Sequence, residues 1–193
     1  VGSEMCIRDR IDSYKSRTAK EADWHICPKP GTDGALAVSI LNYIINNNLV
    51  DNEYVANHTN GFDELKNHVQ GKDSSWASEI TGIPAEQIEK LASEMSTQQP
   101  VGIRIGVALE RHNGGGQTIR AVTCIPALTG AWKHVGGGIT QFPVWEHPYK
   151  FDVICRPDWI PKGTRVVNAL QIGRALLGEN LDKNIPIKSM MCW

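Results

Sequence analysis

Several features that define common protein classes are missing from this sequence of 193 residues. It has no run of about 18 uncharged apolar residues, so no segment is predicted to form a transmembrane helix. Its 20 basic and 21 acidic residues nearly cancel, and this balance gives no reason to expect a nucleic-acid partner. Its five cysteines are scattered without a Cys-x-x-Cys pair, which argues against a zinc site, an iron–sulfur site within this segment or a disulfide framework.

The beginning of the chain carries no recognisable targeting signal. Residues 1–10 have neither the apolar segment of a secretory signal nor a basic amphipathic pattern. They resemble a translated cloning or sequencing artefact, and we exclude them from the fold prediction. We interpret the chain as an internal fragment of a longer protein, and its localisation, cytoplasmic or periplasmic, stays open.

The segment 28–37, Pro-Lys-Pro-Gly-Thr-Asp-Gly-Ala-Leu-Ala, combines a turn, a carboxylate and the start of a helix. Its prolines keep the chain extended, and Gly31 permits a tight turn. Thr32 and Asp33 are residue types that begin helices, and the apolar residues that follow predict a buried helix over about 34–47. A free carboxylate there can accept hydrogen bonds from a donor-rich ligand, and the exposed amides suit a phosphate. An ordinary capped strand-to-helix turn explains the same residues.

A further candidate ligand contact lies where a predicted strand ends. The alternating pattern of residues 100–109 predicts a strand that delivers Glu110 to the carboxyl edge of a sheet. The glycine run 114–116 and a helix over about 117–128 follow, an order that suits either a cofactor cradle or a flexible surface turn.

The remaining segments predict mainly helices. We expect helices at about 15–22, 51–58, 62–69, 73–80 and 166–177, an amphipathic helix opened by Pro84, strands at 24–27 and 187–193, and an ordered covering loop over 142–162. The complete dinucleotide fingerprint Gly-x-Gly-x-x-Gly is absent, so a simple nucleotide-binding module has little support.

Several short motifs follow one another in a characteristic order. They are Asp12-Ser13-Tyr14, Ala22-Asp23-Trp24-His25-Ile26, Gly31-Thr32-Asp33, Gly61-Phe62-Asp63-Glu64-Leu65, Thr81-Gly82-Ile83-Pro84, Ala127-Leu128-Thr129-Gly130 and Gly136-Gly137-Gly138. Each motif is weak alone, but the ordered set closely resembles the large catalytic subunit of the molybdopterin oxidoreductases, the dimethyl sulfoxide reductase and formate dehydrogenase superfamily. The resemblance covers residues 12–193. The sequence departs from the family at Ser13, where proline is usual, and at Glu110, where glutamine is frequent.

The resemblance implies an α/β fold made of parts of two nucleotide-binding-like, Rossmann-related domains. Residues 11–108 would close one dinucleotide-cofactor-binding domain, and residues 109–193 would open a second. The implied cofactor is a bis-molybdopterin guanine dinucleotide with molybdenum or tungsten, used for two-electron redox chemistry or oxygen-atom transfer. The implied cofactor-binding residues are Asp12, Gly31, Thr32, Asp33, Gly106 and Glu110. Asp12 stands where the family has an acidic residue that closes a parallel strand, a position from which carboxylates commonly bind ribose hydroxyls, although a solvated surface aspartate fits as well.

The same resemblance places the metal ligand and the cysteines of an iron–sulfur cluster in segments upstream of this one. We therefore assign no catalytic residue and no metal ligand here, and we expect this fragment to be inactive alone. The implied partners are a small-molecule substrate and electron-transfer subunits, with no nucleic acid and no membrane span in this segment. The alternative is a non-catalytic structural relative in a respiratory complex that keeps the fold without the metal.

Overall fold

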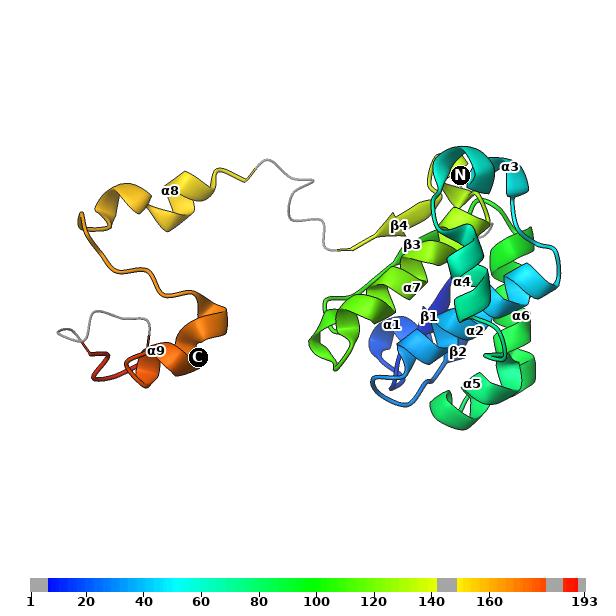
Figure 1. Cartoon of the computed structure of the whole chain (residues 1–193), viewed down its shortest axis with the longest axis horizontal. Coiled ribbons are helices and arrows are strands. Elements are labelled where there is room, and N and C mark those ends of the chain that lie inside the picture. The colour runs from blue at the N-terminus through cyan, green and yellow to red at the C-terminus, as the bar shows by residue number, and fades with distance from the viewer. Residues whose placement is uncertain (1–6, 142–148, 180–185, 191–193) are drawn as a thin grey trace. The chain divides into compact units, whose positions relative to one another are not determined.

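A computed structural model describes residues 7–141, 149–179 and 186–190 of the chain (Figure 1). The chain divides into two compact units, residues 1–146 and 147–193. Each unit is described by itself. The predicted pieces 11–108 and 109–193 refer to domains of a longer protein, and that division stays a prediction.

The first unit contains four strands and seven α-helices among its described residues, and the predicted α/β class is confirmed. The strands are β1 (Asp9–Ile11), β2 (Trp24–Ile26), β3 (Gly102–Arg104) and β4 (Gly138–Thr140). The helices are α1 (Arg17–Lys20), α2 (Asp33–Asn46), α3 (Asn52–His58), α4 (Phe62–His68), α5 (Ser74–Thr81), α6 (Ala85–Thr97) and α7 (Gly115–Leu128), with 3-10 turns η2 (Leu109–Arg111) and η3 (Ala131–Lys133).

Local chemistry explains where the helices begin. The carboxylates of Asp51 and Asp73 accept hydrogen bonds from the amides of Tyr54 and Trp76, each at 2.9 Å, and so cap α3 and α5. Pro84 precedes α6, as its fixed backbone angle predicts. The predicted bounds of α2, α3, α4 and α5 and the predicted start of α6 are confirmed to within two residues, because these helices carry their own start signals.

Helix α2 lies at the centre of the core, as its apolar residues on several faces predicted. It packs against α5, α6 and α7. The side chains of Leu41 and Ile44 are completely inaccessible to solvent. Burial of such aliphatic side chains contributes roughly 1.5–3 kcal/mol each, so α2 holds the neighbouring helices in place.

The strands form two separate parallel pairs. β1 pairs with β2, with Asp9 opposite Trp24, and β3 pairs with β4, with Gly102 opposite Gly138 (Figure 1). The predicted strand 100–109 is wrong in length, because β4 offers only three residues to pair with and the last bond runs from the Ile105 amide to the Thr140 carbonyl. Strand β4 was not predicted, because its glycine-rich sequence carries no strand pattern.

The second unit contains only short elements among its described residues. They are α8 (Phe151–Cys155), η5 (Pro157–Trp159), η6 (Ala169–Gln171) and α9 (Ile172–Leu176). The predicted helix 166–177 is therefore wrong over its first three residues. The predicted strand 187–193 is also wrong where it can be compared, because residues 187–190 form no strand, and residues 191–193 lie outside the described part. The covering loop predicted over 142–162 lies partly outside the described residues and otherwise contains α8 and η5.

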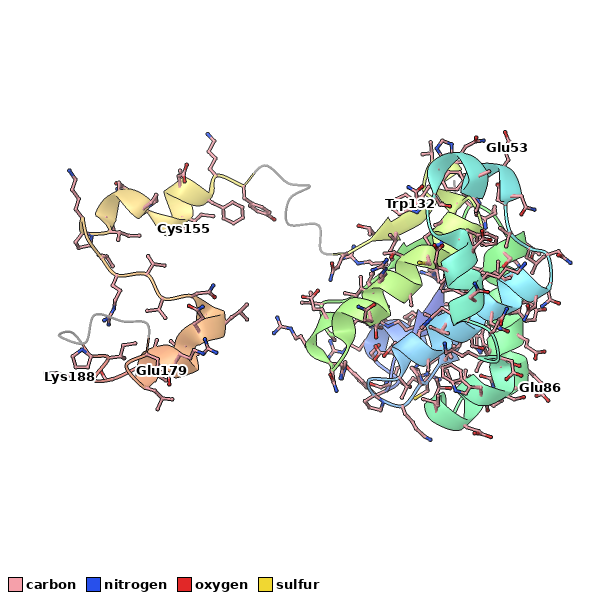
Figure 2. The ribbon with its side chains drawn as sticks, viewed as in Figure 1. Glu53, Glu86, Trp132, Cys155, Glu179 and Lys188 are labelled. Carbon is pink, nitrogen blue, oxygen red and sulfur yellow. The ribbon has the colours of Figure 1, made fainter. Side chains whose placement is uncertain are left out.

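The second unit has almost no core in the part that the structure describes. Ala175 is its only buried apolar side chain there, and Leu170 is 95% exposed. Cys155 also projects from α8 into solvent (Figure 2). Isolated cysteines are usually buried small residues, but Cys155 and also Cys27 are exposed. Among the described residues, no helix combines the length and apolar character needed to cross a membrane.

Candidate functional site

Three segments that are distant in the sequence meet around one pocket of about 240 Å³ in the first unit. They follow the carboxyl ends of three strands, with residues 12–13 after β1, residues 28–31 and Asp33 after β2, and residues 105–106 after β3. Ligands of open α/β sheets bind at this edge. The pocket is therefore the candidate functional site.

Asp12 lies at the end of β1, as predicted, and its side chain is only 18% exposed. Its Oδ2 atom accepts hydrogen bonds from the Arg10 guanidinium, at 2.6 Å from Nη2 and 3.1 Å from Nε. Its amide donates to the Ile26 carbonyl at 3.0 Å, which ties it to the neighbouring strand. Among the described residues nothing binds its Oδ1, so one carboxylate oxygen at the pocket can still accept a hydrogen bond.

The turn before α2 presents a second carboxylate. Gly31 adopts a left-handed φ of 79°, which the predicted tight turn needs. Thr32 precedes the helix, but its hydroxyl donates backwards to the Lys29 carbonyl at 2.6 Å and does not cap the helix amides. Asp33 begins the helix and lines the pocket, and its carboxylate has no hydrogen-bond or ion-pair partner among the described residues.

Basic side chains share the pocket with these carboxylates. Lys29 and Arg104 line it, and His112 lies against Gly31 with its Nδ1 atom 3.4 Å from where a β-carbon of that glycine would be. Lys29 makes one long contact, 3.5 Å from its Nζ to the Glu79 carbonyl, and the Arg104 guanidinium has no partner in the described part of the chain. The rim thus combines free donors with the free carboxylate of Asp33.

The floor of the pocket is apolar. It consists of Leu36, Ala37 and Ile40 from α2, Met95 from α6, and Val122 and Ile125 from α7. Leu36, Ala37, Ile40 and Ile125 also belong to the hydrophobic core. The floor can therefore bury an apolar surface, while polar recognition is confined to the rim.

Of the two remaining predicted contacts, Gly106 lines the pocket and Glu110 does not. Gly106 lines the pocket, and no atom lies within 4 Å of where its β-carbon would be, so a ligand can approach its backbone closely. Glu110 lies in η2, is exposed and accepts a hydrogen bond from the Gln141 amide at 2.6 Å. Glu110 and Thr32 do not line the pocket, and their roles as contacts stay predictions.

The glycine run after η2 serves the protein's own packing first. Gly115 is buried, and a β-carbon there would lie 2.6 Å from the carbonyl oxygens of Leu109 and Glu110. Gly34 at the start of α2 meets α7 in a similar way, since its β-carbon would lie 2.8 Å from Oγ1 of Thr118. The contact at Gly115 places η2 against the start of α7, and the contact at Gly34 places the start of α2 against α7.

The structure thus brings Asp12, Gly31, Asp33 and Gly106 to one pocket. The sequence did not single out Lys29 and Arg104 as site residues. Each is nevertheless a basic residue two positions before a predicted contact, Gly31 and Gly106 respectively. Among the described residues there is no group of three or more His, Cys, Asp or Glu side chains that could hold a metal ion. The chemistry available at this pocket is recognition of a ligand that carries both hydrogen-bond donors and negative charge.

No protein-family model matches the chain. It is 38% identical over 184 residues to a probable oxidoreductase, YoaE, of Bacillus subtilis, a match that covers 95% of this chain and 26% of the relative. It is 32% identical over 212 residues to a probable dimethyl sulfoxide reductase chain, YnfF, of Escherichia coli, covering 93% of this chain and 26% of that one. Among solved structures, acetylene hydratase from Pelobacter acetylenicus matches with a TM-score of 0.63 and 34% identity, over 67% of this chain and 18% of that chain. This chain therefore spans about a quarter of the length of these curated relatives.

Proposed function

Because this chain belongs to the molybdopterin oxidoreductase family, we propose that its pocket binds the nucleotide end of a molybdopterin guanine dinucleotide. The observation that carries the proposal is the free carboxylate of Asp33 at the start of α2, in a pocket formed at the carboxyl ends of three strands. The nucleotide-binding-like character of the fold is part of the same proposal.

The residues of the pocket fit this group chemically. A carboxylate can accept hydrogen bonds from both N1–H and the exocyclic amine of guanine, a bidentate match that adenine cannot offer. Lys29 and Arg104 supply the positive charge that the phosphates of a dinucleotide need. The free Oδ1 of Asp12 can accept a hydrogen bond from a ribose hydroxyl.

Gly106 would let the cofactor approach the backbone, because the space at its α-carbon is open. We assign Thr32 to holding the Gly31 turn through its bond to Lys29 and Glu110 to the neighbouring loop, so any contact of theirs with the cofactor would be made at its periphery.

The bound cofactor would supply molybdenum or tungsten for two-electron redox chemistry or oxygen-atom transfer. The residues of this chain would bind and orient the nucleotide end of the cofactor, balance the negative charge of its phosphates and exclude water from its guanine base. We therefore propose that these 193 residues alone catalyse no turnover. An iron–sulfur cluster, the metal-ligating residue and contacts with electron-transfer subunits would belong to other parts of the enzyme.

The test is guanine recognition by Asp33. In the Asp33→Asn variant an amide replaces one acceptor with a donor, and each lost charge-assisted bond costs about 1.5–3 kcal/mol. We expect GDP to bind the variant at least about tenfold more weakly by isothermal calorimetry, with ADP binding unchanged.

The matched control is Asp63→Asn, which alters an aspartate in the first turn of α4 that does not line this pocket. It should leave GDP binding unchanged. Equal GDP affinity in the Asp33→Asn variant and the unaltered chain would reject the assignment.

A further inference from the structure

The carbonyl of Asp12 lacks the strand partner that its position at the end of β1 would normally give it. In the parallel pair of β1 and β2, the Asp12 amide donates to the Ile26 carbonyl at 3.0 Å. The next bond of such a ladder would run from the amide of residue 28 to the Asp12 carbonyl. Residue 28 is proline, which has no amide hydrogen, so this bond cannot form.

A histidine side chain takes the place of the missing amide. The Nε2 atom of His25 in β2 lies 3.0 Å from the Asp12 carbonyl oxygen. Because a carbonyl oxygen only accepts, Nε2 must carry the proton and donate it. Arg10 and His25 are opposite each other in the register of the two strands, and opposite residues share one face. The bond therefore forms on the face that also carries the ion pair between Arg10 and Asp12.

A similar contact holds the next carbonyl along the chain. The thiol of Cys27 donates to the Ser13 carbonyl at 3.2 Å. Asp12 and Ser13 both line the pocket. Side chains at the end of β2 thus fix the backbone of the pocket wall where Pro28 has ended the ladder.

The bond from His25 leaves Asp12 with one oxygen for a ligand. Its amide is bonded to Ile26, its carbonyl to His25 and its Oδ2 to Arg10. The two backbone bonds lie on either side of the α-carbon and restrict its dihedral angles, while the Arg10 contact restricts the rotation of the carboxylate. Oδ1 is therefore a pre-oriented acceptor, and pre-orientation lowers the entropic cost of binding a ligand.

We infer that His25 is a positioning residue, which acts through the Asp12 carbonyl to direct Oδ1 to the 2′-hydroxyl of the bound nucleotide. His25 does not itself line the pocket, so it acts without touching the ligand. The inference rests on the proposed nucleotide site and adds a discrimination to it, because the one available oxygen suits one hydroxyl. A nucleotide without that hydroxyl leaves Oδ1 unpaired, which lowers its affinity.

The experiment compares the binding of GDP and 2′-deoxy-GDP to the 193-residue chain by isothermal calorimetry. We expect the unaltered chain to prefer GDP by about tenfold or more, since the deoxy ligand loses a hydrogen bond to a charged acceptor. In the His25→Ala variant the preference should fall to about threefold or less, while the affinity for 2′-deoxy-GDP stays within about twofold. A general loosening of the pocket would weaken both ligands alike, so the ratio separates positioning from a purely structural role.

Three further variants examine the role of the donor. His25→Gln keeps an amide donor that can reach the position of Nε2, and it should keep the preference for GDP. His25→Asn has a shorter amide that reaches only the position of Nδ1, so it should lose the preference and replaces His25→Ala if that variant is unfolded. His68→Ala removes a histidine that is exposed on α4 and does not line the pocket, and it should change neither affinity.

The unaltered chain provides an independent readout, because 15N NMR at alkaline pH shows which ring nitrogen of His25 carries the proton. A proton on Nδ1 in place of Nε2 would overturn the inference, as would an unaltered chain without a preference for GDP. Equal loss of both affinities in His25→Ala, or an unchanged ratio, would overturn it as well. If Asp33→Asn weakens GDP binding while His25→Ala leaves the ratio unchanged, the inference fails and the proposed function stands. Absence of GDP binding would overturn both.

Discussion

Gly115 lies closer to the preceding turn than any residue with a β-carbon could. A methyl group there would lie 2.6 Å from two carbonyl oxygens of η2, which must move for α7 to begin where it does. Its neighbour Gly116 has no atom within 4 Å of the corresponding position. The two residues differ only in what surrounds them.

We expect Gly115→Ala to lower the free energy of unfolding by about 1–3 kcal/mol, as overpacking does. Gly116→Ala is the control and should be neutral or stabilising by up to about 1 kcal/mol, because alanine favours helix. Urea denaturation of both variants measures the difference. Equal stabilities would show that η2 yields to a methyl group without cost.

Asp51 provides a pH-dependent contact at the residue scale. It accepts a hydrogen bond from the Tyr54 amide and forms an ion pair with Lys133 of η3. The hydrogen bond from Lys133 lowers the pKa of the Asp51 carboxyl from its ordinary value of 3.8, and the hydrogen bond from the Tyr54 amide adds a smaller effect in the same direction. A lowered folded-state pKa contributes stability above the unfolded pKa, and that contribution is lost as the pH falls through the folded-state pKa.

In the Asp51→Asn variant the side chain can still cap α3, so the change isolates the ion pair. We expect a loss of about 0.2–1 kcal/mol at pH 7, in the range of partly exposed pairs. The loss should shrink as the pH falls below about 4, where the Asp51 carboxyl of the unfolded chain takes up a proton, and should vanish once the pH is also below the lowered folded-state pKa. Urea denaturation at several pH values tests this, and a pH-independent loss would contradict the ion-pair explanation.

At the scale of elements, the sequence predicted helices well and strands poorly. Helix α6 carries its signals locally, with Pro84 before it and Ile88, Leu91 and Ala92 buried on one face. Strand β4 exists only because β3, more than thirty residues earlier, offers it a partner. No local pattern encodes that pairing, and Gly138 in β4, with a φ of 100°, resembles a loop residue.

The candidate site was likewise predictable where local signals mark its residues, but not where distant segments meet. Proline and glycine marked the loop before Asp33, so this residue could be singled out from the sequence, and the family resemblance singled out Asp12. Their meeting with Arg104 in one pocket depends on contacts between the ends of distant strands. Glu110 was displaced from the predicted position because the strand before it ends at Arg104 and a 3-10 turn follows.

The two units of the whole molecule differ in how they are stabilised. The first has a continuous core around α2. In the second, the described polar contacts join near neighbours, such as the 2.6 Å pair between Arg156 and Asp158, with the Arg156 guanidinium also 4.2 Å from the ring centre of Trp159. Large apolar side chains such as Val166 and Leu170 are at least 90% exposed.

Removal of residues 147–193 should therefore leave the melting temperature within about 2 °C of the value for the complete chain. It should also reduce self-association, because exposed apolar surface is removed. Differential scanning calorimetry and light scattering of the 1–146 chain measure the two effects. A markedly lower melting temperature would mean that the second unit supports the core of the first.

The central position of α2 has a consequence for how the protein is made. Its apolar faces are covered by α5, α6 and α7, and α7 begins only at Gly115. Ribosomes add roughly 5–20 residues per second, so α2 emerges several seconds before its last partner. During that interval the nascent chain presents an apolar helix to the cytosol, and this is when we expect chaperones to bind it.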